Sequence, residues 1–270
     1  MIKIRDRWVN VPAGGPLEFA AREIYGDTQQ YVEFNRKSLH KFGRNEGAST
    51  TEEDVNYNGI EPSHPTTNAV DTVTSTNAGD TTQTVRIEGM YLDGNDDFVF
   101  SVQNIALNGQ TEVPLSQNLA RCTRIANVAS ATAIAGDVYV FDNASGSTNG
   151  VPNVTADIGN VMVQADQTTL FAGTSIAATN YFVCTGFYAY VGAATPTADA
   201  VDIRFKIRNK DSVYRTVTVL TISPTIEAEH KFEPYLIIGP NSDIDITAVT
   251  NSGTASVSAG FSGYFADIIT

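Results

Sequence analysis

The sequence has 270 residues, of which 42% are hydrophobic and 17% are charged, and its formal net charge at pH 7 is −13. This length suits one large or two medium domains. The 42% hydrophobic content excludes a wholly disordered chain. No apolar run approaches the roughly 18 residues of a membrane-spanning helix, which excludes a helical membrane protein. Because an acidic body repels the phosphate backbone, we expect no nucleic-acid partner and no membrane partner.

The first part of the chain, residues 1–67, has the texture of an arm. Apolar residues at helical spacing predict one short helix over residues 17–31. Residues 43–67 are polar and rich in Gly, Ser, Thr and Pro, which indicates an extended segment with little core of its own. We therefore expect residues 68–270 to fold without this arm.

The charge of this region differs from that of the rest of the chain. Residues 1–50 carry eight Lys/Arg and six Asp/Glu, whereas the whole chain is acidic. Either the positive excess lets the arm dock on an acidic neighbour, or it is chance variation. The first seven residues hold four charges where a secretory signal needs an apolar segment, so we expect no export signal.

Beyond residue 68, short runs of β-branched and aromatic residues alternate with Gly, Asn and Asp turns, as is typical of β-sandwiches. The candidate strands are 69–75, 82–91, 97–106, 120–128, 137–142, 161–165, 180–191, 201–208, 213–222, 227–238, 243–250 and 255–268. No amphipathic helix interrupts the second half of this series, so its sheets should be antiparallel. The predicted fold class is mainly β: an N-terminal arm (1–67) with a short helix, then two antiparallel, jelly-roll-like β-sandwich domains (68–170 and 171–270).

One predicted strand carries a local charge pattern that stands out. In residues 201–208 apolar residues take one face, and the other face carries a basic stripe of Arg204, Lys206 and Arg208 that continues to Lys210. Like charges on one sheet face cost free energy unless acids lie opposite or across an interface. The stripe is therefore either a partner-docking surface or a solvated face that neighbouring acids balance.

Catalytic and metal-binding motifs are missing from the sequence. His40, His64 and His230 lack zinc-ligand spacing, and no phosphate-binding glycine loop and no nucleophile elbow are present. Cys122 and Cys184 form no disulfide framework and should be buried free thiols. We therefore expect no enzyme activity, no cofactor and no metal.

Two features leave alternatives open. Residues 93–97 (Asp-Gly-Asn-Asp-Asp) resemble the first half of a calcium loop, but Phe98 stands where the loop needs glycine, so a hairpin turn is the other interpretation. The 11 Tyr and 13 Phe could supply a carbohydrate-stacking surface, although aromatic residues in strands more often belong to the core.

Several segments together carry a family resemblance. They are His40–Asn45, Thr84–Gly89, Leu107–Leu115, Arg121–Ile125, Ala135–Val140, Val201–Asn209 and Ser256–Tyr264. With them, the chain from residue 40 onward resembles a family of virion structural proteins of tailed bacteriophages, seen chiefly in marine and cyanobacterial phages.

The resemblance implies a non-enzymatic virion protein made in the host bacterial cytoplasm. We expect a capsid decoration or cement protein, anchored through its arm on the major capsid protein and assembled with copies of itself, most simply as a trimer. The alternatives are a tail, neck or fibre-adaptor protein that contacts tail or neck proteins, and a carbohydrate-binding or receptor-binding β module. Expected interface residues are Arg204, Lys206, Arg208, Phe42 and Arg44, with the stripe facing acids of another chain.

Overall fold

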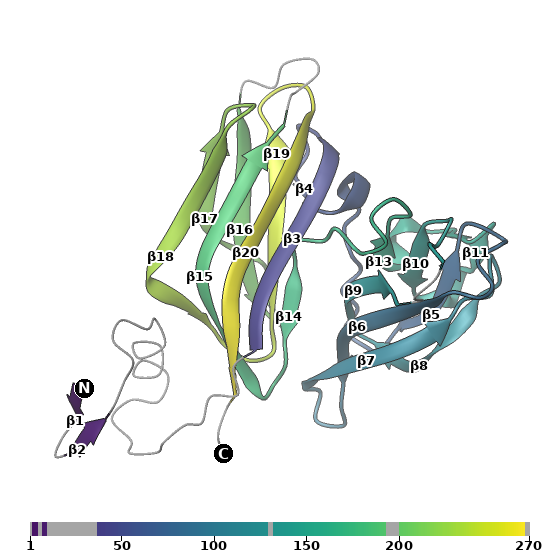
Figure 1. The fold of residues 1–270 in the computed structure, drawn as a ribbon, viewed down its shortest axis with the longest axis horizontal. Helices are drawn as coiled ribbons and strands as arrows, with labels where there is room; N and C mark the ends of the chain where they lie inside the picture. Colours follow the sequence, from purple (N-terminus) through teal and green to yellow (C-terminus); the bar gives the residue numbers. More distant parts are fainter. Residues whose placement is uncertain (1, 5–6, 10–36, 129–131, 193–199, 268–270) are drawn as a thin grey trace.

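The computed structural model describes residues 2–4, 7–9, 37–128, 132–192 and 200–267. It is mainly β with antiparallel sheets, which confirms the predicted fold class, and the strands from residue 37 onward form two modules (Figure 1). The helix expected at residues 17–31 lies outside the described residues. At the N-terminus, β1 (Ile2–Ile4) and β2 (Arg7–Val9) form a two-stranded hairpin. No helix in the described part of the chain is long and apolar enough to span a membrane.

Module 1 contains the first half of the series of strands. One sheet has the order β13-β10-β5-β8, with β13 (Ile158–Met162), β10 (Val138–Phe141), β5 (Val70–Ser75) and β8 (Val113–Leu119). The other has the order β7-β6-β9, with β7 (Phe98–Ala106), β6 (Thr84–Leu92) and β9 (Arg121–Asn127). Val73, Ile87, Leu119 and Val140 belong to the buried cluster of this module. A small hairpin of β11 (Ser147–Thr148) and β12 (Val151–Pro152) extends from one end, and the 3-10 turns η2 (Asn143–Ser145) and η3 (Thr155–Asp157) flank it.

Module 2 is a sandwich of two larger sheets. The first has the order β18-β15-β20-β3, with β18 (Glu227–Ile238), β15 (Asn180–Val191), β20 (Ala255–Asp267) and β3 (Lys37–Ala48). The second has the order β14-β19-β16-β17, with β14 (Thr174–Ile176), β19 (Ser242–Thr250), β16 (Val201–Asn209) and β17 (Arg215–Ile222). Phe205 lies between the sheets, with its ring centroid 5.6 Å from both Phe187 and Phe261. The alternating aromatic residues of the strands therefore form the core.

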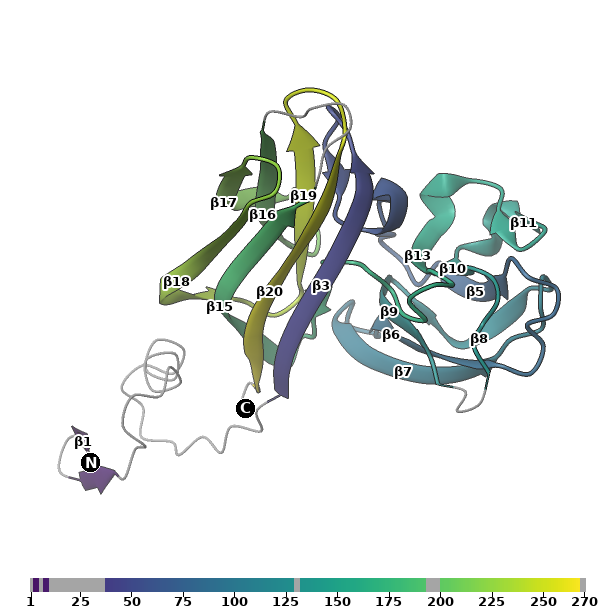
Figure 2. The same cartoon turned by 45° about the horizontal axis from the view of Figure 1, so that its top comes forward.

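Residues 37–60 correct the expectation of an arm without a core. Here β3 pairs with β20 over ten register positions, from Phe265 opposite Lys37 to Ala255 opposite Ala48 (Figure 2). The two-residue strand β4 (Glu53–Asp54) pairs with β19, and the 3-10 turn η1 (Tyr57–Gly59) follows. This segment completes module 2, although module 1 separates it in sequence from the rest of that module.

The sequence does not identify β3 because its buried positions are small or polar. Gly43 and Asn45 are buried where a strand normally shows large apolar residues. A Cβ atom on Gly43 would lie 2.3 Å from both the Ala172 amide nitrogen and the Val55 carbonyl oxygen, so only glycine permits this approach. The close packing of backbone on β3 therefore replaces the hydrophobic alternation that marks other strands.

The chain passes from module 1 to module 2 between Thr169 and Ala172. The Thr169 hydroxyl donates to the Ile125 carbonyl oxygen in module 1, whereas the Ala172 amide donates to the Val55 carbonyl oxygen in module 2. Cys122 and Cys184 are buried free thiols, as the sequence predicts, and burial raises the pKa of each to about 12. Such thiols are protonated and unreactive at neutral pH.

Candidate functional site

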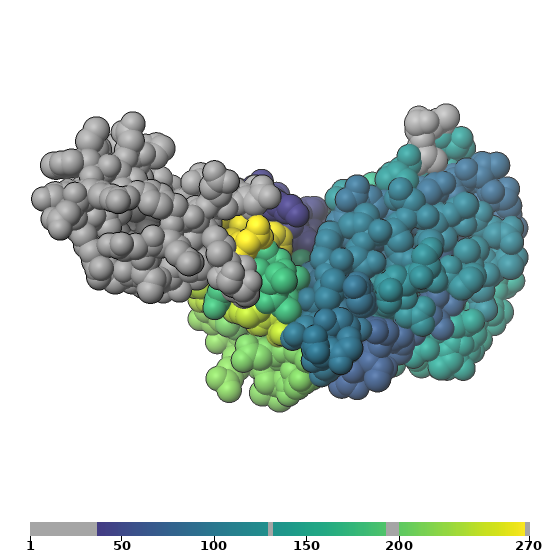
Figure 3. Space-filling view, turned by 90° about the horizontal axis from the view of Figure 1, so that it is seen from below, coloured from purple at the N-terminus to yellow at the C-terminus, as the bar shows by residue number. Residues whose placement is uncertain are grey.

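The two modules touch along one side (Figure 3), and a buried ion-pair network lies at their contact. Arg121 begins β9 in module 1, and its Nε lies 3.1 Å from Oδ1 of Asp243 on β19 of module 2. Nε of Arg208 on β16 lies 2.9 Å from Oδ2 of the same carboxylate, and the Ser175 hydroxyl donates to Oδ1 at 2.6 Å. Arg121 is 4% exposed and Asp243 is 1% exposed. One carboxylate thus receives donors from both modules.

The electrostatics of Asp243 follow from these neighbours. Burial alone would raise its pKa, but the Arg121 guanidinium, aided by Ser175 and Arg208, outweighs burial and holds the pKa below its usual value. Asp243 is therefore ionised at neutral pH. Removing one member of such a buried pair leaves an uncompensated charge, which is strongly destabilising.

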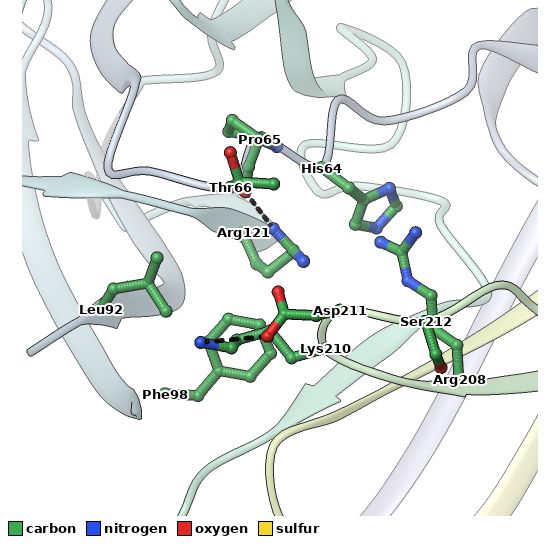
Figure 4. Close-up of a pocket in the computed structure, with 10 residues that line it drawn as sticks. All are labelled: His64, Pro65, Thr66, Leu92, Phe98, Arg121, Arg208, Lys210, Asp211 and Ser212. Atoms are coloured by element: carbon green, nitrogen blue, oxygen red, sulfur yellow. Dashed lines mark hydrogen bonds and ion pairs between the residues drawn. The ribbon is translucent and has the colours of Figure 1, made fainter. Parts of the chain in front are cut away.

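A cavity of about 240 Å³ opens beside this network (Figure 4). Its lining residues come from both modules and from the segment that connects them: His64, Pro65, Thr66, Leu92, Phe98, Arg121, Arg208, Lys210, Asp211 and Ser212. The Arg121 guanidinium lies 4.9 Å from the Phe98 ring centroid and donates to the Pro65 carbonyl oxygen at 2.8 Å. Lys210 at its rim bonds to Asp96 of module 1, which adds a second ion pair between the modules.

The cavity provides binding groups but no catalytic pair among the described residues. Burial lowers the pKa of His64 to about 3, so its imidazole is neutral at neutral pH. The Ser212 hydroxyl donates to the Asn209 carbonyl oxygen at 2.9 Å, so its proton is directed to the backbone. Nη2 of Arg208 is buried and makes no hydrogen bond within the described chain, and a polar cavity of this volume can hold water that satisfies it.

A second buried group lies under β4 and links it to the sheet. Asp54 of β4 lies beside Asp245 of β19, and both side chains are buried. Burial, together with the neighbouring Asp245 carboxyl, raises the pKa of Asp54, which remains protonated at neutral pH. Two close carboxyl groups share one proton in this way because both cannot ionise at low dielectric.

Lys41 adds a third link between the modules, after the ion pairs Arg121–Asp243 and Lys210–Asp96. It points from β3 toward β9, where its ammonium donates to the Thr123 carbonyl oxygen at 2.7 Å. Burial lowers its pKa to about 8, and Glu88 is the strongest of the charges that oppose this shift. The three links together make the contact between modules a polar joint, which is desolvated at Asp243 and Lys41 and exposed at Asp96.

The basic stripe finds its acids within this chain. Arg204 and Lys206 both bond to Glu52, which lies just before β4, and Lys206 does so at 2.8 Å. Arg208 bonds to Asp243 as described above. The sequence left two alternatives open for the stripe, and the structure shows the second, in which neighbouring acids of the same chain balance it. This corrects the expectation that the stripe faces acids of another chain.

The other two expected interface residues lie apart from the joint. Phe42 is 42% exposed on the outer face of β3, and Arg44 forms a surface ion pair with Glu46 at 3.2 Å. Their contact with a partner stays a prediction.

Residues 93–97 form a hairpin turn between β6 and β7. Oδ1 of Asp93 accepts hydrogen bonds from the Asn95 and Asp97 amides at 2.8 and 3.1 Å, and Asp96 has a φ of 64°. This confirms the turn that the sequence offered as one interpretation. No group of three or more His, Cys, Asp or Glu that could hold a metal occurs among the residues that the structure describes.

Sequence reasoning missed Arg121, Asp243, Asp54 and Asp245. The two aspartates of β19 alternate with Ile244 and Ile246, a pattern typical of a half-solvated strand. Module 1 and β4 cover that polar face instead. The only sequence signal was the density of acids in residues 243–245, which does not reveal their partners.

No family model matches the sequence, and no curated protein matches it significantly. Two solved structures are distantly similar. One is the N-terminal CBM22-1-CBM22-2 tandem domain of Paenibacillus barcinonensis Xyn10C, at 12% identity and TM-score 0.22, covering 73% of this chain and 77% of that chain. The other is that of infectious bursal disease virus Gt strain, at 12% identity and TM-score 0.21, covering 92% of this chain and 77% of that chain.

Proposed function

We propose that this two-module β protein is a non-enzymatic structural protein of a phage virion that assembles with copies of itself. The virion class rests on the family resemblance of the chain from residue 40 onward, and the observation that carries self-assembly is the apolar edge strand β17 of module 2. It is the last strand of its sheet, with Val217 38% exposed and Val219 43% exposed. Val213, just before the strand, is 75% exposed.

Long apolar edge strands are unusual in proteins that stay monomeric. Soluble proteins protect their edges with charges, proline or short length, because an open edge pairs with other chains. The neighbouring edge strand β18 has such protection in Glu229, Glu233 and Pro234, whereas β17 has one charged residue, Arg215, at its start. This contrast favours pairing of β17 with another chain.

A second copy of the chain is the partner that we propose for β17. Phe100 and Val102 on β7 form another exposed apolar patch, in module 1. Two different apolar patches on one chain suit a head-to-tail contact, and such a contact forms a ring where the rotation between copies closes. A trimer is the simplest such ring, and the joint between the modules would hold its two contacting surfaces at a fixed angle.

Within the particle, we assign the protein to capsid decoration or cementing. Because β3 and β4 belong to module 2, the residues that remain for anchoring on the capsid shell are those before Lys37. A tail, neck or fibre-adaptor role is the alternative within the same class. Copy number in purified particles separates the two roles, because decoration needs hundreds of copies and an adaptor needs few.

The experiment that tests self-assembly compares solution masses. The chain has a mass of 28.9 kDa, and we expect light scattering after size exclusion to give about three times that value. The double variant Val217→Lys/Val219→Lys should be monomeric, whereas the control Val154→Lys, at a 41% exposed site in module 1, should assemble normally. A monomeric wild-type chain, or a double variant that still assembles, would contradict the proposal.

A further inference from the structure

The outer face of the sheet β18-β15-β20-β3 carries four aromatic rings on one side of the molecule. Tyr188 lies opposite Gly260 of β20, and Gly260 lies opposite Phe42 of β3, so these three residues form one row across three strands. Directly opposed residues point to the same face of a sheet. With His40 and Tyr190 on the adjacent rows, these rings form what we call the aromatic platform: His40, Phe42, Tyr188 and Tyr190.

The platform is open to solvent in the described structure. Phe42 is 42% exposed and Tyr190 is 46% exposed. In Figures 1 and 2 the strands β15, β20 and β3 face the viewer, and no described segment crosses them. Exposed rings gathered on one face are a common mark of a binding surface, whereas scattered ones need no explanation.

Glycine in the middle strand allows one ring to lie flat. A Cβ atom on Gly260 would lie only 2.4 Å from the Tyr188 hydroxyl oxygen, so the ring of Tyr188 crosses directly over this position. The Tyr188 hydroxyl reaches β3, where it donates to the Lys41 carbonyl oxygen at 3.3 Å and lies 2.9 Å from Nε2 of His40. The absence of a side chain on Gly260 thus lets Tyr188 lie along the sheet.

Hydrogen bonds hold two of the four rings, His40 and Tyr188, in position before any ligand arrives. The His40 and Tyr188 rings are stacked, with centroids 5.4 Å apart and planes 12° apart. Nδ1 of His40 lies 2.8 Å from the Ser262 hydroxyl, which fixes the other side of the imidazole. A surface ordered in this way loses little conformational entropy on binding.

Polar groups border the rings on both sides. On the neighbouring strand β18, Glu229 lies opposite Tyr188 of β15, and Glu227 lies opposite Tyr190 of β15. On the other side, Ser258 of β20 lies between Tyr190 of β15 and Arg44 of β3. Carboxylates accept hydrogen bonds, guanidinium groups donate them, and hydroxyls do both. The platform therefore combines flat apolar faces with hydrogen-bonding groups at their edge.

We propose that the aromatic platform binds the pyranose rings of a glycan. A pyranose presents C–H groups on its flat faces and hydroxyls around its rim, and the electron-rich face of an aromatic ring attracts such partial positive charge. Residues two apart on a strand are separated by about 6.5 Å, and strands two apart in a sheet by about 9.5 Å, which allows neighbouring sugar units to contact different rings.

Other occupants fit this surface less well. Glu227 and Glu229 would repel the phosphates of a nucleic acid. A stable protein partner needs about 800 Å² on each side with a core depleted of charge, whereas charged and hydroxyl side chains border these four rings immediately. The platform also lies on a different sheet from β17, so glycan binding does not depend on the assembly proposed above.

The test measures binding by isothermal titration calorimetry of the full chain with cellohexaose, mannohexaose and maltohexaose. We expect at least one of them to bind, and Tyr190→Ala and Phe42→Ala each to weaken that binding by roughly two- to tenfold. Phe100→Ala is the matched control, because Phe100 is a 49% exposed aromatic residue on module 1, and it should leave the affinity unchanged. Because all three rings are exposed, melting temperatures should confirm that the variants fold.

Three results would overturn the inference. The first is that none of the three hexasaccharides binds. The second is that binding occurs but Tyr190→Ala and Phe42→Ala leave the affinity unchanged or match Phe100→Ala. The third is that Phe42→Ala reduces self-association and leaves sugar affinity intact, which would assign the platform to contact between protein copies.

Discussion

Deletion of residues 1–60 should unfold module 2 while a chain that begins at Lys37 keeps it folded. The shorter chain loses β3 and β4, which contribute ten register pairs with β20 and two with β19. At a net value of about 0.5–1 kcal/mol for each pair, these backbone hydrogen bonds contribute on the order of 6–12 kcal/mol. Val55, which is fully buried, adds roughly 1.5–3 kcal/mol through loss of its apolar contacts.

This loss equals the whole stability of an ordinary domain, which is about 5–15 kcal/mol. Urea denaturation followed by circular dichroism should show one transition fewer for residues 61–270 than for residues 37–270. Module 1 should keep its transition, because its buried cluster contains no residue from 37–60. Equal midpoints and amplitudes for the two chains would refute the assignment of β3 to the core of module 2, and would restore the idea of a separable arm.

The remaining predictions concern charges. Asp243→Asn should lower the free energy of unfolding by about 3–5 kcal/mol, because it leaves the guanidinium groups of Arg121 and Arg208 without a counter-charge. Lys210→Ala removes a partly exposed ion pair and should lower the free energy of unfolding by less than about 1 kcal/mol in the same denaturation assay. Because the folded-state pKa of Asp54 is raised, the stability that Asp54 contributes is present at low pH and is lost as pH rises above the unfolded pKa of about 3.9. Asp54→Asn should therefore raise Tm by several degrees at pH 8 and have little effect near pH 4. An equal shift in Tm at both pH values would refute the shared proton. The depressed pKa of Asp243 acts in the opposite direction, so its stabilisation should disappear only as pH falls below about 4. Millimolar calcium or a chelator should leave Tm unchanged if residues 93–97 are only a turn, and a calcium-dependent rise equivalent to about 1–2 kcal/mol would contradict this.

Many strands could be predicted from the sequence. The expected strands at 180–191 and 227–238 match β15 and β18 in both limits, and the expected 201–208 and 97–106 differ from β16 and β7 by one residue at one end. These segments alternate large apolar residues with polar ones. That period of two is a local property, so it is readable without the fold.

The missed strand β8 shows why other segments were not readable. Its residues 114–118 are Pro, Leu, Ser, Gln and Asn, a run with weak β propensity. In the structure the Gln103 side chain accepts hydrogen bonds from the Ser116 and Gln117 amides at 2.9 and 3.1 Å and donates to the Gln117 carbonyl oxygen at 2.8 Å. A side chain from β7 thus satisfies this backbone, which no local pattern can indicate.

The amino-acid sequence by itself determined the β class, the alternating cores and the free thiols, because each depends on local composition and on residues that are neighbours along the chain. Only the tertiary structure decided that β3 completes module 2, that Asp243 joins the modules through Arg121, and that His40 stacks on Tyr188. These pairs are more than 100 residues apart, and their free energy comes from desolvation and close approach. Such terms exist only after the strands have packed.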